Sequence, residues 1–234
     1  MTRPDRSLIA ALPLFDGLDP ADLDRILAQA RLIRVARDAA VFEQDAEADR
    51  FFLLLEGHVR VVKTTADGQQ VIVRTISAGE MIGIAQALGR TTYPATAVAT
   101  VACVVIAWPG RLWSEFAAAF PNFQQRTYKS VGQRLEDAHN KIVEMSTEQV
   151  EQRVARSLMR LVEQTGRKTE DGILIDLPIS RQSIAEMSGT TLHTVSRLLS
   201  GWEERGLIKS GRQKVIVVEP RRLTMLAEGR DRTG

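Results

Sequence analysis

Cysteine and histidine are scarce in this chain, and their scarcity excludes several kinds of site. The 234 residues include one cysteine, Cys103, and three histidines. No disulfide framework can form, and zinc or iron–sulfur sites of the four-cysteine kind have no ligands. Cys103 lies within the apolar run 101–108, and no nucleophile motif accompanies it. We therefore expect neither a metal centre nor an enzyme.

Long uncharged apolar runs are also missing. No apolar stretch approaches the roughly 20 residues that cross a membrane, and the N-terminal segment has no long apolar core. We expect a cytoplasmic protein that does not contact a membrane. The formal net charge is only +2, so affinity for nucleic acid must come from charge concentrated in one part of the chain. The length permits two modest domains.

The segment 177–218 contains two short helical patterns separated by a glycine turn. Ser180 is a candidate N-cap for the first helix, and Thr191 can cap a second helix that runs from Leu192 to about Glu204. Apolar residues recur at three- and four-residue steps along the second helix. Two strand-like runs around a basic turn follow this helix. The pattern predicts a winged helix-turn-helix.

The second of these helices has the features of a DNA-reading helix. A helix of this length fits the major groove, where side chains near its N-terminus reach base edges. Arg197 can donate two hydrogen bonds to one guanine, to O6 and N7, and such a bidentate contact is worth roughly 1–3 kcal/mol of discrimination against other bases. From Arg181 onward there are ten Lys and Arg against six Asp and Glu, whereas the first 180 residues have 21 against 23. An ordinary helical pair with a solvated face is the alternative to binding double-stranded DNA.

The residues GTTLHTVSRLLSGWEERGLI, followed by KVIVV, resemble the C-terminal domain of the cAMP receptor protein/FNR (CRP/FNR) superfamily of bacterial transcription regulators. The rest of the chain resembles this superfamily too. FNR-type members carry Glu-x-x-Ser-Arg on the reading helix, and here the motif reads His193-Thr194-Val195-Ser196-Arg197. This version is most similar to the nitric-oxide-responsive NnrR-type branch. Histidine can donate to a base or accept from it, whereas glutamate only accepts, so the family motif does not decide how this base pair is read.

The resemblance implies a homodimer that reads a palindrome with TTG and CAA arms and controls denitrification or nitric oxide response genes. By motif position, base contacts fall to His193, Ser196 and Arg197. Phosphate contacts fall to Arg181, Gln182, Thr191, Thr194 and Lys214. A small-molecule-binding module without direct DNA readout is the alternative function.

The first half of the chain has the pattern of a β structure. From Leu32 to Trp108 the sequence shows strand-like alternation and β-branched runs, with a hairpin turn at 66–69. Many short strands at close spacing predict a small antiparallel barrel or roll. The resemblance identifies it as a β-roll of the cyclic-nucleotide-binding type. We predict an α+β fold with Trp113 and Phe116 as anchors of a short helix against the roll.

The resemblance places the effector pocket between Gly79 and about Ala99. Members that bind cAMP carry a glutamate and an Arg-Ser pair where this chain has Ile84-Ala85 and Pro94-Ala95. A cyclic phosphate would be buried there without a cation, so we expect no cAMP binding. The candidate lining residues suit an apolar or planar ligand: Ile82, Ile84 and Leu88.

Haem is the candidate cofactor that the nitric-oxide-responsive branch implies. Its axial ligand would be His139 or His58, and a solvated or turn histidine is the alternative at both positions. The resemblance implies no iron–sulfur cluster here, because the N-terminal cysteines of the oxygen-sensing members are missing.

Pro121 opens a long helix with a heptad-like seam. Apolar residues follow one another at alternating steps of three and four: Tyr128, Val131, Leu135, Ala138, Ile142 and Met145. This spacing favours dimerisation, and packing on the chain's own core is the alternative. We expect a β-roll sensor domain at 1–120, a dimerisation helix at 121–146 and a DNA-binding domain at 147–234.

Two segments of the C-terminal part show no regular pattern. The polar stretch 166–172 reads as an exposed loop, and in the superfamily the corresponding loop touches RNA polymerase. The tail after Pro220 is basic, and we expect it to be disordered in part.

Overall fold

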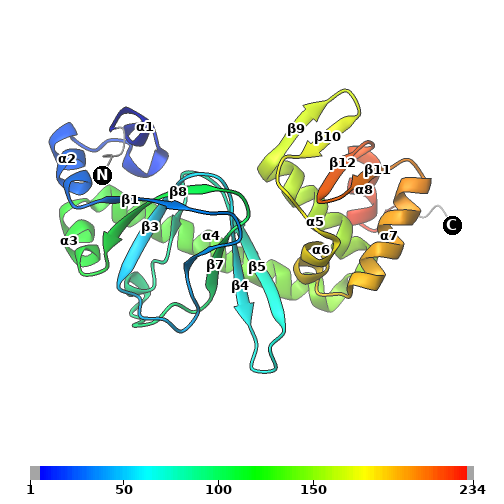
Figure 1. The fold of residues 1–234 in the computed structure, drawn as a ribbon, viewed down its shortest axis with the longest axis horizontal. Coiled ribbons are helices and arrows are strands. Elements are labelled where there is room, and N and C mark those ends of the chain that lie inside the picture. Colours follow the sequence, from blue (N-terminus) through cyan, green and yellow to red (C-terminus); the bar gives the residue numbers. More distant parts are fainter. Residues whose placement is uncertain (1–5, 231–234) are drawn as a thin grey trace. The chain divides into compact units, whose positions relative to one another are not determined.

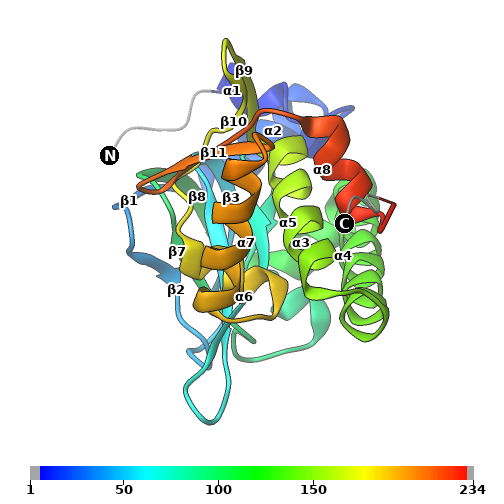
Figure 2. The same cartoon turned by 90° about the vertical axis from the view of Figure 1, so that its right-hand side faces the viewer.

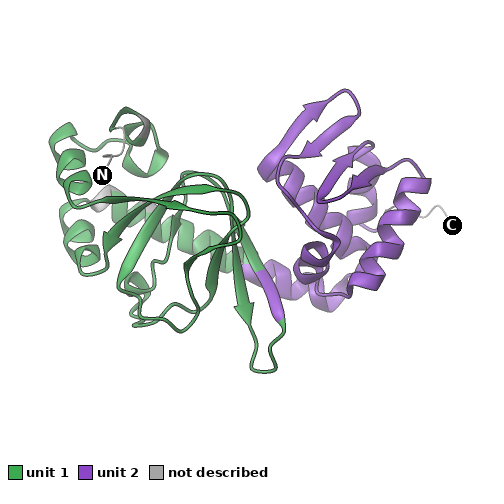
Figure 3. Ribbon diagram, viewed as in Figure 1, with its two compact units in different colours: residues 1–69, 73–137 green, residues 70–72, 138–234 purple. Residues whose placement is uncertain are grey.

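The computed structural model describes residues 6–230, except for the side chains of residues 8, 121, 122 and 126. The chain divides into two compact units (Figure 3). The first unit extends to Asp137 without residues 70–72, and the second continues from Ala138. The division therefore falls within helix α4 (Pro121–Thr147). The three-part division expected from the sequence, with boundaries after residues 120 and 146, stays a prediction.

Two four-stranded sheets form the centre of the first unit (Figure 1). One sheet has the order β1-β8-β3-β6 and the other the order β2-β7-β4-β5. The first contains β1 (Arg31–Val35), β8 (Cys103–Pro109), β3 (Arg50–Glu56) and β6 (Met81–Ile82). The second contains β2 (Ala40–Phe42), β7 (Thr96–Ala99), β4 (Val59–Thr64) and β5 (Gln70–Ile76). The expected β-roll is confirmed.

Strand β3 is apolar along its length because both of its faces are covered. Side chains alternate between the two faces of a strand. Phe52 and Leu54 enter a core that the two sheets share. Phe51 and Leu53 enter a second core, which the sheet shares with helices. The run of five apolar residues in this strand thus reflects burial on both sides.

Helices cover the outer face of the β1-β8-β3-β6 sheet. They are α1 (Arg6–Ala10), η1 (Pro13–Phe15), α2 (Pro20–Ala28) and α3 (Leu112–Ala119), and η2 (Gln86–Leu88) follows β6. Trp113 and Phe116 of α3 are 7% and 2% exposed. Both rings meet Phe51 edge-on, with centroids 5.2 and 5.9 Å away. The two anchors predicted from the sequence are therefore confirmed.

Helix α4 exposes most of the apolar seam that the sequence predicts. Val131 packs against the core of the first unit, and Ala138 is exposed. The other four seam residues are between 45% and 64% exposed: Tyr128, Leu135, Ile142 and Met145. In a single copy of the chain the seam therefore faces water. Among residues 6–230, no helix combines the length and the apolar character needed to cross a membrane.

The second unit is a winged helix-turn-helix, seen from the side of its helices in Figure 2. The two helices are α6 (Arg181–Ser188) and α7 (Leu192–Glu204), and α7 has the bounds that the sequence predicts. The wing consists of β11 (Ile208–Gly211) and β12 (Lys214–Val217), in a sheet of order β11-β12-β10-β9. The remaining elements are α5 (Val150–Thr165), β9 (Gly166–Thr169), β10 (Gly172–Ile175) and α8 (Pro220–Ala227).

Two segments of the second unit correct the sequence-based expectation. The stretch 166–172 is not a loop throughout, because its first half is strand β9, which pairs with β10. A polar strand shows no apolar alternation, so the pattern could not reveal it. The tail after Pro220 forms helix α8, whose Leu223 and Leu226 are buried against the rest of the unit. The expected disorder is thus wrong for residues 220–227.

Candidate nucleic-acid interface

Helix α7 is fixed by a side-chain cap and by a buried apolar face. Oγ1 of Thr191 accepts a hydrogen bond from the backbone N–H of Thr194 at 3.2 Å. This cap satisfies one of the free N–H groups in the first turn. Val195, Leu199 and Trp202 are at most 1% exposed. Burial of these three side chains sets the rotation of α7 and turns its polar face outward.

The structure brings the three predicted base contacts onto this outward face. His193 and Arg197 are exposed, and Ser196 is half-buried between them. Arg197 makes no hydrogen bond or ion pair with another residue of the described chain. Its guanidinium is therefore available to an external partner with two acceptors, such as the major-groove edge of guanine.

Three of the five predicted phosphate contacts lie in the first turn of α7 or in the wing. Lys214 is exposed at the start of β12, and Thr191 is exposed at the N-cap of α7. The hydroxyl of Thr194 lies 3.0 Å from that of Thr191. Arg212 is exposed at the tip of the wing. Arg212 lies in the basic turn that the sequence places between the two strands of the wing, and its position near Lys214 adds a second cation there.

Arg181 and Gln182 open α6, and both already have partners within the second unit. Arg181 donates to the hydroxyl of Ser210 at 3.3 Å and lies 3.9 Å from the carboxylate of Glu203. Gln182 donates to Glu186 at 2.9 Å. A phosphate contact from either residue would replace these bonds. It would therefore contribute less net free energy to DNA binding than a contact from an unpaired side chain.

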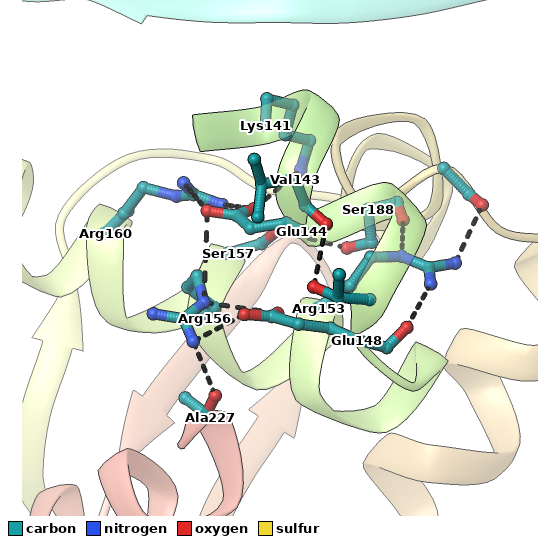
Figure 4. A network of polar contacts seen from close by, with 12 residues as sticks. Lys141, Val143, Glu144, Glu148, Arg153, Arg156, Ser157, Arg160, Ser188 and Ala227 are labelled. Atoms are coloured by element: carbon teal, nitrogen blue, oxygen red, sulfur yellow. Dashed lines mark hydrogen bonds and ion pairs between the residues drawn. The ribbon is translucent and has the colours of Figure 1, made fainter. Parts of the chain in front are cut away.

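Arg153 of α5 holds the turn between α6 and α7, although the sequence did not single it out. The residue is 8% exposed. Its guanidinium donates to three backbone carbonyls, those of Glu148 at 2.8 Å, Ser188 at 3.1 Å and Gly189 at 3.5 Å (Figure 4). Ser188 and Gly189 end α6, and Glu148 follows α4, so the negative ends of two helices meet one buried cation. No local pattern could show this, because Arg153 and Ser188 are 35 residues apart.

A second polar cluster ties the end of α4 to α5. Glu144 is 7% exposed and accepts two hydrogen bonds from Arg160, at 2.8 and 2.7 Å (Figure 4). Lys141 and Arg156 lie 3.7 and 3.9 Å from the same carboxylate. Burial raises the pKa of Glu144, but Arg160, with the charges of Lys141 and Arg156, outweighs burial and holds the pKa below its ordinary value. Glu144 is therefore ionised at neutral pH.

The three residues expected to line an effector pocket are not gathered at one place. Ile82 is 2% exposed in the core between the sheets, and Ile84 is 5% exposed in the core beneath the helices. Leu88 is 49% exposed. Both isoleucines belong to well-packed cores that strand alternation alone could not tell apart. The assignment of the three residues to an effector pocket stays a prediction.

The described part of the first unit does contain a pocket of about 570 Å³. It is lined by Pro13 and Leu14 of η1, by residues 79–81, and by the side of α4 from Thr127 to Arg134. Of the segment from Gly79 to Ala99, in which the effector pocket is expected, only Gly79, Glu80 and Met81 line this pocket. The long helix supplies most of the polar groups.

Neither candidate haem ligand lines this pocket. His58 is half-buried before β4, where its carbonyl accepts hydrogen bonds from the backbone and the hydroxyl of Thr100, both at 2.9 Å. His139 is exposed on α4. An axial ligand must face the cavity that holds the porphyrin. The residues around this pocket therefore do not fit haem held there by a histidine.

Comparison with known proteins matches both units to families. Residues 32–119 match the cyclic nucleotide-binding domain, and residues 152–226 match the Crp-like helix-turn-helix domain. The chain is 22% identical over 223 residues to the CRP-like cAMP-activated global transcriptional regulator of Mycobacterium tuberculosis, covering 94% of this chain and 98% of that protein. It is 26% identical over 211 residues to the nitrogen fixation regulation protein FixK of Bradyrhizobium diazoefficiens, covering 90% and 88%. The structure of FixK2 from Bradyrhizobium japonicum superposes with a TM-score of 0.74 at 22% identity, covering 84% and 96%.

A β-roll, a long helix and a winged helix-turn-helix, in this order, define a DNA-binding transcription regulator. The two relatives named above are transcription or nitrogen fixation regulators, and the match extends over 98% and 88% of their lengths. The chain thus has the domain composition of a CRP/FNR-type regulator, with a cyclic nucleotide-binding domain followed by a Crp-like helix-turn-helix domain.

Proposed function

We propose that the chain acts as a homodimer that reads a palindromic DNA site and controls denitrification or nitric oxide response genes. The observation that carries this proposal is the outward face of α7, where His193 and Arg197 are exposed, Arg197 has no partner among the described residues, and the opposite side of the helix is buried. By resemblance, the two arms of the site are TTG and CAA. The His-Thr-Val-Ser-Arg motif supports the choice of the nitric-oxide-responsive branch.

The exposed seam of α4 supports the dimer. Four apolar side chains at heptad spacing, each about half exposed or more, form an apolar stripe that a second copy of the same helix would cover. A two-fold axis along this stripe makes the interface isologous. Two symmetric copies of α7 then predict half-sites about one helical turn apart.

Control by an effector follows from the same helix. α4 carries pocket-lining residues at its N-terminal half and the Glu144 cluster at its C-terminal end. We propose that an effector bound in the first unit changes the packing of the seam between Ala138 and Met145. A shift in the population of seam states then reorients the two reading helices.

Fluorescence anisotropy with labelled duplexes tests DNA readout directly. The protein should bind a TTG/CAA palindrome at least about a thousandfold more tightly than a scrambled duplex of equal length at physiological salt. A chain that acts only as a small-molecule-binding module would bind both duplexes equally and weakly. That result would overturn the proposal.

Haem remains part of the proposal for the nitric-oxide response, with His139 and His58 as the remaining candidate ligands. An absorbance spectrum of protein purified from anaerobic, nitric-oxide-exposed cells tests it. A Soret band that shifts in the His139→Ala or His58→Ala variant supports haem ligation. A spectrum without a Soret band, also after addition of hemin, contradicts it.

The β9–β10 hairpin is the proposed contact with RNA polymerase. Asp171 at its turn is 2.5 Å from Lys209 of the wing, so changing Asp171 would also disturb the wing. Lys168 and Glu170 make a cleaner test. Their substitution by alanine should lower activated transcription in vitro while DNA affinity stays unchanged, and equal loss of both would contradict the contact.

A further inference from the structure

The pocket in the first unit has an excess of positive charge. Lys129 and Arg134 both line it, and within residues 6–230 neither is paired with a carboxylate. The nearby carboxylate, that of Glu80, is already engaged by Arg74 and by the backbone N–H of Ser77 at 2.9 Å. A cation excess beside apolar walls is costly unless an anion compensates it.

Arg134, which lines this pocket, and the neighbouring Arg74 each have one guanidinium nitrogen without a hydrogen-bond acceptor. Arg134 donates through Nη2 to the carbonyl of Met81 at 2.6 Å. Its Nε is buried without a partner, and so is Nη1 of Arg74. Burial of Arg134, together with the charge of Arg74, lowers the pKa of Arg134 to about 10, while Glu80 acts in the opposite direction. The protein alone therefore leaves this cation under-stabilised.

We propose that this pocket binds a small organic acid, with an apolar body and one carboxylate. Pro13, Leu14 and Met81 offer apolar surface to the body. Arg134 and Lys129 receive the carboxylate. A single carboxylate fits better than a phosphate, because one edge of the Arg134 guanidinium is already bound to the Met81 carbonyl.

The site joins α4 to the loop that leads into β6. Residues 79–81 and the stretch 127–134 of α4 form opposite parts of its lining. A bound acid would therefore strengthen the attachment of α4 to the roll. Its role as the effector of transcription rests on the proposed function, whereas binding itself does not and is measured without DNA.

Calorimetry and thermal unfolding of the full chain test this site with benzoate and octanoate. Both acids should bind the purified protein and raise its unfolding temperature. Their neutral counterparts, benzamide and octanamide, should bind at least about tenfold more weakly, because a charge-assisted hydrogen bond is worth about 1.5–3 kcal/mol. Inorganic phosphate should bind more weakly than either acid. Equal binding of acids and amides, tighter binding of phosphate, or no binding of either acid would overturn the proposal.

Three variants locate the bound acid. Arg134→Gln should abolish binding, and Arg111→Gln, which removes an exposed cation outside the lining, should leave it unchanged. Ser130→Trp should also abolish binding, because it fills the hollow while both cations stay. Unchanged affinity in Ser130→Trp would place the acid elsewhere. DNA affinity without acid, measured in parallel, separates failure of this site from failure of DNA reading.

Discussion

Two arginines of the second unit show how environment decides the role of a residue. Arg153 is buried and surrounded by carbonyl oxygens, so its charge serves the fold. Arg197 is exposed and has no partner among the described residues, so its charge serves a ligand. The sequence revealed Arg197 through its place in a motif. It could not reveal Arg153, because the partners of that side chain are carbonyls of distant residues.

Loss of Arg197 should relax base specificity. The Arg197→Ala variant should lose roughly 1–3 kcal/mol on the TTG/CAA palindrome and much less on duplexes that change the contacted guanine. Lys214→Ala is the matched control, because a phosphate contact carries no sequence information. It should weaken all duplexes alike and flatten the slope of log K against log salt by about one. Anisotropy titrations at several salt concentrations distinguish the two outcomes, and equal behaviour of both variants would contradict the assignment.

Loss of Arg153 should loosen the reading helix. Arg153→Met removes the donor to the carbonyls of Glu148 and of the buried Ser188, which costs about 1–3 kcal/mol in urea unfolding. We also expect a smaller ratio of specific to non-specific DNA affinity. Arg221→Met, at an exposed position of α8, should change stability by no more than about 0.5 kcal/mol. A destabilised Arg153→Met protein with an unchanged affinity ratio would show that Arg153 has no part in placing α7.

The end of α4 lies against the turn of the helix-turn-helix, where the Met145 side chain approaches Gly189. Gly189 ends α6 with φ of +61°, and a Cβ at this position would collide with the end of the Met145 side chain. Gly189→Ala should therefore cost more than about 1 kcal/mol of stability. The cost should be smaller in the Met145→Ala background, which removes the collision but not the unfavourable φ.

Gly201→Ala is the control for this substitution. Gly201 lies within α7 and has nothing within 4 Å of a Cβ, so alanine should stabilise the helix by up to about 1 kcal/mol. Chemical denaturation of the four variants gives the coupling. Equal costs of Gly189→Ala in both backgrounds would mean that Met145 does not touch the turn.

The Glu144 cluster makes the junction of α4 and α5 sensitive to acid. The pKa of Glu144 in the folded chain lies below the ordinary value of 4.5. Its ionised form therefore contributes stability above that value, and the contribution is lost as the pH falls through the folded pKa. Glu144→Gln should be less stable than wild type at about pH 7, and the difference should shrink below about pH 4. A difference that is constant with pH in urea unfolding would contradict the cluster.

Elements with local signals were predicted well from the sequence. Helix α7 has a capping threonine, a regular apolar face and a terminating glycine, and its bounds were correct. Strand β9 is polar and exists through pairing with β10. Helix α8 is stable because Leu223 and Leu226 enter a core formed by other elements. The pocket near Arg134 likewise depends on segments that are distant along the chain, so no local pattern could indicate it.

At the scale of the whole molecule, the proposed dimer depends on the seam of α4. Leu135→Glu and Ile142→Glu would each bury a carboxylate and its symmetry mate at the seam, which a dimer cannot compensate. Sedimentation should show monomers for both variants and dimers for wild type. Asn140→Glu, on the same helix outside the seam, should remain dimeric. Dimers in all four proteins would place the interface elsewhere.

The spacing of half-sites tests the central claim most directly, since two α7 helices related by a two-fold axis must enter successive grooves on one side of the duplex. We would measure the affinity for a TTG/CAA palindrome and for the same palindrome with about five base pairs inserted at its centre, roughly half a helical turn. The account predicts that the insertion lowers affinity at least about tenfold, toward that of a single half-site. Equal affinity for the two duplexes would contradict it.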